Sequence, residues 1–328
     1  MMNKRKINIS INLLTWNGEK YLPWVLKSLN EQSFKGWDLL VLDNASSDKS
    51  LEIIKEYCPS AKIIKQKENI GFARGHNLLI NWSSSDYILV LNQDIILDKD
   101  YLKKIVKFLE ENPLVASAAG KTMYWDFNKG KKSKIIDSWG FKIDKKRKIV
   151  DWNQGKKDYD LENKEVFGLS GAVVVYRRRN LENIKELKGN SFQYFDEDFF
   201  TYKEDIDLSW RLRLNGWENY LITNTKAYHH RTISLKIDRK LRGSINRISY
   251  RNHLMLLYKN SFFRNFIKDF YYIFWYEFKK IIYFLIYERA TLLGLKDFIK
   301  AIPSLRKKRK FIKKLRKVKA EEIYKWFK

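Results

Sequence analysis

Short apolar runs alternate with stretches of helical spacing along the first hundred residues of the chain. Strand-like runs bounded by turn residues and helix-like spacing of 3–4 residues are the main local signals of secondary structure. The strand-like runs occupy 6–16, 37–46, 61–68 and 87–94, and the helical spacing occupies 17–33, 47–58 and 71–85. This alternation predicts an α/β fold with a mostly parallel sheet covered by helices on both faces.

Polar residues end three of the predicted strands. Thr15 and Asn17 follow the first strand, Asp43 and Asn44 follow the second, and Asn92, Gln93 and Asp94 follow the run YILVL. Ligands bind parallel sheets outside the carboxyl ends of the strands, so the three polar ends predict one site. A carboxylate at the end of a buried strand needs a helix N-terminus, a basic side chain or a metal ion as its partner.

The second half of the chain continues this pattern and then departs from it. Residues 121–165 are rich in lysine and predict a surface excursion or hairpins, whereas 168–178 predict a further strand. Residues 196–217 predict a turn followed by a helix that ends at Gly216.

Beyond about residue 235 the sequence becomes helical, aromatic and basic, in particular at 244–261 and 266–293. Charged residues interrupt the second stretch, so it lacks the roughly 18–20 uncharged apolar residues of a membrane-spanning helix and predicts interfacial amphipathic helices. We therefore predict a catalytic domain at 1–234 and a basic, aromatic, membrane-associating extension at 235–328.

Positive charge is concentrated in this extension. The formal net charge of the 328 residues is +27, and residues 235–328 hold 26 Lys and Arg against 7 Asp and Glu. A block at 306–319 has ten cations and no acid, which suits nucleic acid, anionic lipid or a solvated helix. The single cysteine, Cys58, excludes an intramolecular disulfide and a cysteine-cluster zinc site, and it suits a reducing cytoplasm.

Six segments in order across 7–234 resemble the family 2 glycosyltransferases, which have the GT-A fold. They are LLTWNGEKYLPWVLKSLNEQS, VLDNASSDKS, ENIGFARGHN, LNQDIIL, FFTYKEDIDLSWRLRLNGW and AYHHRTIS. The resemblance implies an inverting transfer of a sugar from a nucleotide-sugar donor to a glycan acceptor. The motif set looks like that of bacterial rhamnosyltransferases of surface polysaccharide pathways, which favours dTDP-rhamnose and leaves a UDP- or GDP-hexose open.

The same resemblance implies roles for individual residues. Donor binding falls to Thr15, Asn17, Asp43, Asn44, Gly71, Arg74, Asn77, Asn92 and Gln93. Asp205 becomes the general base with Glu204 beside it, and the acceptor side comprises Gly171, Trp210 and Arg211. Asp94 and His229 would hold a divalent cation, Mg²⁺ or Mn²⁺, with His230 as the substitute for His229. The family's metal motif has two acidic residues; Asn92 replaces the first here, which makes the histidine ligand more important.

Simpler interpretations compete with these roles. Asp94 and Asp43 also suit turns or helix caps, Asp205 suits the first turn of a helix, and Asp207 is expected to be structural. Two other protein classes remain open. A nucleotidyltransferase usually has a glycine- and arginine-rich loop after its first strand, where this chain has TWNGEKYLPW. A non-enzymatic protein that binds nucleic acid or another anionic surface would use the charge but leave the acidic strand ends unexplained.

We therefore expect an enzyme peripheral to the cytoplasmic face of the membrane. The basic amphipathic helices suggest an anionic membrane surface as one partner and a lipid-linked, polyprenyl-type saccharide as the acceptor. No nucleic-acid partner is expected.

Overall fold

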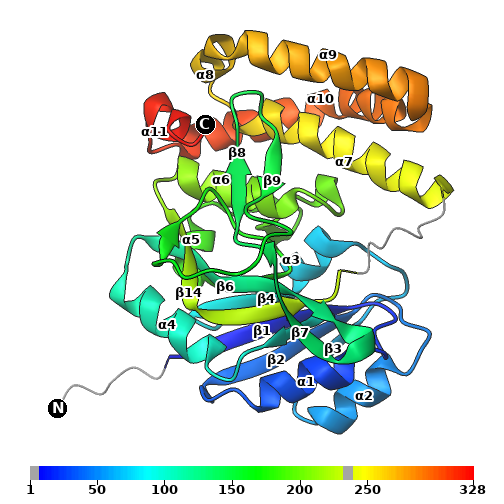
Figure 1. Cartoon of the computed structure of the whole chain (residues 1–328), viewed down its shortest axis with the longest axis vertical. Coiled ribbons are helices and arrows are strands. Elements are labelled where there is room, and N and C mark those ends of the chain that lie inside the picture. Colours follow the sequence, from blue (N-terminus) through cyan, green and yellow to red (C-terminus); the bar gives the residue numbers. More distant parts are fainter. Residues whose placement is uncertain (1–6, 232–238) are drawn as a thin grey trace.

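The computed structural model describes residues 7–231 and 239–328 (Figure 1). Its main sheet contains β1 (Ile9–Thr15), β2 (Trp37–Asp43), β3 (Lys62–Lys65), β4 (Tyr87–Asn92), β5 (Ile95–Leu97), β6 (Val115–Asp126), β7 (Lys131–Ser138), β10 (Lys164–Glu165), β11 (Val173–Arg177) and β14 (Glu218–His229). The strand order is β10-β14-β6-β11-β4-β1-β2-β3, with β5 paired to β14 and β7 to β6.

The sheet is mostly parallel, as the sequence predicts. Strand β1 lies parallel to β2 and β4, β2 is parallel to β3, and β14 is parallel to β6. Strand β11 runs antiparallel between β4 and β6. Almost every residue of β1, β4 and β11 is buried, because helices and loops cover both faces of the sheet.

Helices flank the sheet on both faces (Figure 1). They are α1 (Leu22–Asn30), α2 (Ser50–Tyr57), α3 (Phe72–Trp82), α4 (Tyr101–Glu111), α5 (Arg178–Glu182) and α6 (Glu204–Leu214). Helix α4 buries Leu102, Ile105, Val106 and Leu109, the spacing of one apolar face on a surface helix. The predicted helices at 17–33, 47–58 and 71–85 are confirmed as α1, α2 and α3.

The lysine-rich segment 121–165 forms hairpins. Strand β6 pairs with β7, and β8 (Phe141–Ile143) pairs with β9 (Ile149–Asp151). A smaller hairpin joins β12 (Glu186–Lys188) to β13 (Ser191–Gln193). The predicted helix at 196–217 is α6, which ends at Leu214, and Gly216 follows with a φ of 87°.

The C-terminal region comprises α7 (Arg239–Asn260), α8 (Phe263–Lys268), α9 (Phe270–Tyr287), α10 (Arg289–Leu315) and α11 (Ala320–Tyr324). It shares a second apolar core with α6, in which Trp210 packs among Leu256, Leu305, Ile312 and Phe327. The described helices of this region therefore fold as part of the body of the protein. The expected boundary between 234 and 235 remains a prediction.

Helix α9 is the outermost helix of this layer (Figure 1). Of its 18 residues only Ile273 is buried. Two of its charged residues, Glu277 and Lys280, face inward, where the Glu277 carboxylate lies 2.9 Å from Nε2 of His253 and 3.1 Å from Nζ of Lys280, whereas Lys279 is exposed. Its exposed face carries Phe270, Tyr271, Phe274, Trp275, Phe278, Ile282, Leu285 and Ile286. Among the described residues, no helix is both long enough and apolar enough to cross a membrane.

Candidate active site

The polar strand ends meet at the carboxyl edge of the sheet, as the sequence predicts. Thr15 ends β1 directly beside Asp43 at the end of β2, and Leu14 pairs with Asn92 at the end of β4. Parallel pairing of β1 with both neighbours places these residues on one edge. The fold thus gathers the predicted donor-binding residues Thr15, Asp43 and Asn92.

Gln93 fixes the loop that follows β1. Its Oε1 accepts hydrogen bonds from Oγ1 of Thr15 at 2.7 Å and from the backbone N–H of Trp16 at 2.8 Å. A Cβ added to Gly18 would come within 2.4 Å of the same oxygen, so only glycine fits there. Gln93 therefore shapes the edge by holding this loop, while its predicted contact with a donor remains a prediction.

The neighbouring residues build the turn that starts α2. The Asp43 carboxylate accepts from the backbone N–H of Ser46 at 3.2 Å, and Oδ1 of Asn44 accepts from Ile70 N–H at 3.2 Å. Asn17 has a φ of 49°, and its side chain accepts from Ser47 N–H at 2.9 Å. The alternative turn and capping roles of Asp43 and Asn44 are thus present, and their contact with a nucleotide base stays a prediction.

Gly71 connects the donor edge to the opposite side of the cleft. Its φ is 83°, and an added Cβ would lie 2.6 Å from the ring of Phe200. The carbonyl of Phe200 accepts from Phe72 N–H at 2.9 Å and Ala73 N–H at 3.3 Å, the first backbone donors of α3. Phe200, Tyr202 and Lys203 themselves have φ between 63° and 71°, which is strained backbone for non-glycine residues.

Two residues of the glycine loop have different surroundings from one another. Arg74 is exposed in the first turn of α3, and its contact with a phosphate stays a prediction. Asn77 is buried, and its amide bonds the backbone of Tyr194 and Phe195. The prediction that Asn77 binds the donor is wrong, because its donor and acceptor groups are used to position the segment before α6.

Asp94 and His229 come together as predicted for a pair of metal ligands. Strand β5 pairs with β14, and Nε2 of His229 lies 3.5 Å from Oδ2 of Asp94. On its other side, Nδ1 of His229 lies 2.8 Å from Oδ2 of Asp137. Burial lowers the pKa of His229, but the charge of Asp94 and the hydrogen bond to Asp137 raise it to about 9.

His230 has other neighbours, so its role as the substitute ligand stays a prediction. Its Nδ1 lies 3.2 Å from the backbone oxygen of Trp125, and its ring packs against Tyr21 and Phe127. A histidine that binds a metal through one ring nitrogen usually donates the other N–H to a carboxylate, as His229 can to Asp137. His229 and Asp94 therefore fit a divalent cation, although no set of three or more His, Cys, Asp or Glu within residues 7–231 and 239–328 is arranged as a metal site.

Three residues of this side were missed from the sequence: Asp137, Asp151 and Arg231. Nε of Arg231 lies 2.5 Å from Oδ1 of Asp137, and Nη2 lies 2.8 Å from Oδ2 of Asp151. Asp137 follows Ile135 and Ile136 near the end of β7, so an isolated acid beside apolar residues was the available signal. The surrounding lysines obscured this signal, because a lysine-rich segment is typical of an exposed surface.

Asp205 lies at the start of α6 on the opposite side of the cleft. Its Oδ2 accepts from Gly171 N–H at 2.8 Å, and its Oδ1 accepts from Ile206 N–H at 2.8 Å. A Cβ on Gly171 would lie 3.1 Å from the Cβ of Asp205 and 3.0 Å from the ring of Phe72. Gly171 therefore lets the backbone approach the carboxylate, and its predicted place on the acceptor side stays a prediction.

The two carboxylates Glu204 and Asp205 hold protons more tightly than usual. Burial raises the pKa of Asp205, although the N–H groups of Gly171 and Ile206 act against it. Burial, together with the adjacent charge of Asp205, raises the pKa of Glu204 well above its ordinary range. Oε2 of Glu204 is buried without a hydrogen-bond partner in the described part of the chain. A carboxylate with a raised pKa and a fixed orientation suits proton abstraction from a hydroxyl group.

Trp210 and Arg211 are not acceptor-side residues. Trp210 is fully buried between Phe167 and Phe327. Arg211 is buried as well, with Nε donating to Asp207 at 2.8 Å and its other groups donating to backbone oxygens of Ile184 and Tyr194. Both predictions are wrong, because the helical period turns these positions toward the core while Asp205 faces the cleft. The expected structural role of Asp207 is confirmed by this ion pair.

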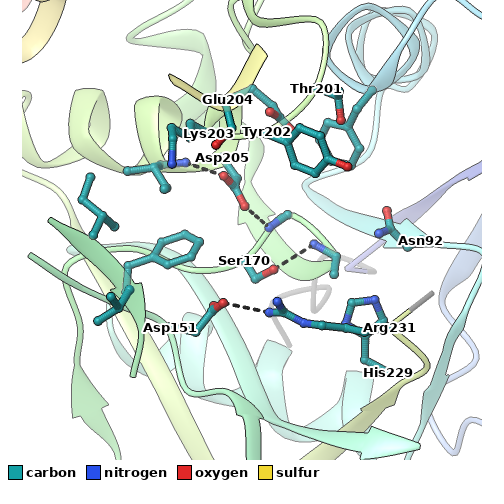
Figure 2. Close-up of a pocket in the computed structure, with 18 of the residues that line it drawn as sticks. Asn92, Asp151, Ser170, Thr201, Tyr202, Lys203, Glu204, Asp205, His229 and Arg231 are labelled. Carbon is teal, nitrogen blue, oxygen red and sulfur yellow. Dashed lines mark hydrogen bonds and ion pairs between the residues drawn. The ribbon is translucent and has the colours of Figure 1, made fainter. Parts of the chain in front are cut away.

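A cavity of about 540 Å³ joins the two sides of the site. Figure 2 shows Glu204 and Asp205 on one side, with Asp151, His229 and Arg231 across from them and Asn92 nearby. Asp94, Gly171 and Lys203 complete the polar lining. The cavity thus brings together a candidate base, a candidate metal pair and one polar strand end, all at the carboxyl edge of the sheet.

This arrangement defines a GT-A-type glycosyltransferase, a parallel sheet whose carboxyl edge faces an acidic cleft. The chain belongs to glycosyl transferase family 2, whose model matches residues 10–185. An uncharacterized glycosyltransferase of Haemophilus influenzae is 34% identical over 110 residues, which cover 33% of this chain and 44% of that protein. The poly(ribitol-phosphate) beta-N-acetylglucosaminyltransferase TarS of Staphylococcus aureus is 26% identical over 111 residues, 32% of this chain and 19% of that one. The chain thus matches less than half the length of these relatives.

Solved structures agree with the fold. The structure of S. aureus TarS residues 1–349 superposes with a TM-score of 0.53 at 17% identity, covering 97% of this chain and 89% of that one. The structure of GalNAc-T7 with UDP, GalNAc and Mn²⁺ gives a TM-score of 0.59 at 11% identity, over 78% of this chain and 48% of that one. At these identities the likeness concerns the fold.

Proposed function

We propose that the protein is an inverting glycosyltransferase that moves a sugar from a nucleotide-sugar donor to a hydroxyl group of a growing cell-surface glycan. The observation that carries the proposal is the common cavity of Asp205 and the pair Asp94 and His229. An acid–base group and a diphosphate-binding pair on opposite sides of one cleft are what a single displacement at a sugar carbon requires.

In this mechanism the acceptor oxygen attacks the anomeric carbon as its proton passes to the Asp205 carboxylate. The bond between that carbon and the diphosphate oxygen breaks, and the nucleoside diphosphate leaves with the electron pair. Gly171 N–H and Ile206 N–H hold the carboxylate in one orientation. Burial and the charge of Asp151 raise the pKa of Asp205, which strengthens proton binding at the base.

Asp94 and His229 would hold the divalent cation, Mg²⁺ or Mn²⁺. Such a cation, bound through one or two protein groups and phosphate oxygens, supplies charge stabilisation for the leaving diphosphate. Asp137 orients His229 through Nδ1, which leaves Nε2 directed to the Asp94 side. The complex of GalNAc-T7 with Mn²⁺ supports a cation in this fold.

For the donor we propose dTDP-rhamnose, with a UDP- or GDP-hexose as the alternative. The preference rests on the resemblance of the motif set to rhamnosyltransferases. The similarity to TarS, named as a β-N-acetylglucosaminyltransferase, and the UDP bound to GalNAc-T7 favour the alternative. The residues expected to select the donor are the strand-end residues Thr15, Asp43 and Asn44.

The proposed acceptor is a lipid-linked saccharide, and the proposed place of action is the cytoplasmic surface of the membrane. Support comes from the exposed face of α9, which carries aromatic residues together with the exposed Lys279, while Glu277 pairs with Lys280 and with His253 on the inner side. Aromatic side chains combined with lysine and arginine suit the boundary between headgroups and acyl chains. This face therefore replaces the purely basic block 306–319 as the main candidate for membrane contact.

The first experiment measures release of nucleoside diphosphate from a panel of dTDP-, UDP- and GDP-sugars with Mg²⁺, with Mn²⁺ and with chelator. We expect turnover of one donor with metal. Asp205→Asn should lower the rate about 10²–10⁴-fold, the usual contribution of a general base, and Asp94→Ala should abolish the metal response. Asp160→Asn, at an exposed position away from the cleft, is the matched control. Failure of every donor to bind or react would refute the proposal.

A further inference from the structure

A groove leads from the active-site cavity along the space between α7 and α9. Its first part has a volume of about 350 Å³ and shares Ile149, Lys203 and Ser249 with the active-site cavity. Its second part, of about 690 Å³, shares Asn246, Tyr283, Glu288 and Thr291 with the first. We call these two parts together the α7–α9 groove. The shared walls make it a continuation of the cleft in which Asp205 lies.

The groove is strongly cationic. Among the described residues its walls contain Lys148, Lys203, Lys280, Arg242 and Arg289, against the acid Glu288, and of these cations Lys280 pairs with Glu277 at 3.1 Å. Glu288 is already held by Asn246 at 2.9 Å and Thr291 at 3.1 Å. His253 also lines the groove but is neutral, because burial lowers its pKa to about 4 despite its hydrogen bond to Glu277. This charge excess fits an anionic ligand.

Lys203 is the most informative of these cations. It is half-buried at the junction of the groove with the active-site cavity, and its backbone is held at a φ of 71°. Its ammonium group has no hydrogen bond or ion pair with any described residue, and the same is true of Lys148. Burial and the charge of Lys280 lower the pKa of Lys203, and the charges of the carboxylates Asp205, Glu204 and Asp151 offset this only in part. A sheltered ammonium group with no direct ion pair is costly to bury, and a phosphate ligand would supply the missing contact.

The groove becomes apolar away from Lys203. Tyr276, Tyr283 and Phe284 of α9 line its first part, and Ile286 and Tyr287 line its second part. Other residues of α9, among them Phe270, Phe274 and Trp275, are exposed on the surface of the same helix. One helix thus forms both the wall of the groove and the candidate membrane surface, so a lipid could pass from a bilayer into the groove without crossing bulk water.

We propose that the α7–α9 groove binds the phosphate group and the first isoprenoid units of the lipid that carries the acceptor sugar. Lys148 and Lys203 contact the phosphate, and the aromatic wall of α9 contacts the hydrocarbon chain. This inference rests on the proposed function and adds the acceptor subsite to it. The alternative source of a phosphate, the donor diphosphate, fits less well, because the donor edge and the Asp94–His229 pair lie on other walls of the cavity.

The test uses farnesyl phosphate below its micelle concentration as the probe and the full chain, with binding measured by isothermal titration calorimetry. Farnesol, which lacks the phosphate, and inorganic phosphate, which lacks the lipid, are the comparison ligands. We expect farnesyl phosphate to bind at least tenfold more tightly than either one. Lys203→Met and Lys148→Met should each weaken it about tenfold, and Lys134→Met, at an exposed lysine of β7, should not change it.

Several outcomes would overturn the proposal. These are the absence of farnesyl phosphate binding, equal binding of farnesol, unchanged binding by both lysine variants, and displacement of the probe by dTDP or UDP. Displacement would assign the cations to the donor. Donor turnover is measured separately. Turnover without binding of farnesyl phosphate would support glycosyl transfer and refute lipid binding in the groove. Binding of farnesyl phosphate without turnover of any donor would support lipid binding in the groove and refute glycosyl transfer.

Discussion

Helices α6 and α9 have burial patterns opposite to their compositions. Helix α6 has the sequence EDIDLSWRLRL, with three acids and two arginines, yet ten of its eleven residues are buried. Helix α9 has the sequence FYYIFWYEFKKIIYFLIY, yet only Ile273 is buried. Composition alone would assign the first to the surface and the second to the core. The difference shows that available partners, rather than residue type, decided which helix lies inside.

The charges of α6 are tolerated because almost all have partners in the fold. Asp207 is bound by Arg211 at 2.8 Å, by Lys259 at 2.9 Å and by Asn260 at 2.8 Å. Arg213 reaches Glu165 at 2.7 Å. Lys259 also joins Lys308 at the buried Asp196, whose pKa the two lysines lower against the effect of burial. Within the described part of the chain the exceptions are Glu204 and Asp205, which have no ion pair and line the cleft; Asp205 is held only by the N–H groups of Gly171 and Ile206.

The largest effect is expected from removing a partner inside α6. Asp207→Leu leaves Arg211 and Lys259 buried with less compensation, so the free energy of unfolding should fall by about 3–5 kcal/mol. Urea denaturation followed by circular dichroism measures this. Asp160→Leu, at an exposed site, should stay within about 0.5 kcal/mol. A loss below 1 kcal/mol in Asp207→Leu would mean that the charges of α6 are solvated and that the contrast with α9 is weaker than it looks.

The next effect concerns the exposed face of α9. Trp275→Ser should leave the free energy of unfolding nearly unchanged but weaken binding to phosphatidylglycerol-containing vesicles about tenfold, because a large aromatic contact with lipid is lost. Trp82→Ser is the matched control, since Trp275 and Trp82 are exposed by 42% and 47%. Co-sedimentation measures binding.

Equal behaviour of the two tryptophan variants would contradict the assignment of this face to the membrane. Analytical ultracentrifugation distinguishes the other use of such a face. A stable dimer that Trp275→Ser disrupts would show that a second copy covers α9 in place of lipid.

The smallest effect is expected at Glu204, a carboxylate of the cleft whose ionisation lowers the free energy of unfolding. The folded protein binds the Glu204 proton more tightly than the unfolded chain, because burial and Asp205 raise its pKa. Its stabilising contribution is therefore complete below the unfolded value of 4.5 and is lost as the pH rises through the folded pKa.

Glu204→Gln should remove this loss and raise the free energy of unfolding at pH 8 by about 1 kcal/mol, with less change at pH 4. Thermal denaturation across that pH range measures the difference. An identical pH profile for the wild type and Glu204→Gln would show that Glu204 is ionised at no cost in the folded protein.

The sequence predicted the parallel half of the fold well. Short apolar strands followed by amphipathic helices are local signals, and the polar strand ends Thr15, Asp43 and Asn92 lie on one edge because parallel pairing requires it. The meeting of Asp94 with His229 was also accessible, since both follow from the motif order of the family.

The remainder depended on long-range packing that local patterns do not encode. Trp210 and Arg211 share a helix with Asp205, but the core formed with α7, α10 and α11 decides which face is inside. Asn77 lies in the glycine motif yet serves residues more than one hundred positions away. Asp137 and Arg231 belong to segments whose approach depends on the β6–β7 hairpin and β14.

The close contact of Gly71 with Phe200 has a consequence for attempts to change acceptor specificity by exchanging segments between relatives. The carbonyl of Phe200 serves as the cap of α3, and the ring of Phe200 fills the space where a side chain at position 71 would lie. In a chimera whose residues 186–231 come from another enzyme, the native helix α3 is therefore capped by a foreign residue at position 200. Such a transplant should fold only when residues 69–73 travel with it, so the donor and acceptor halves of this enzyme are not independent modules.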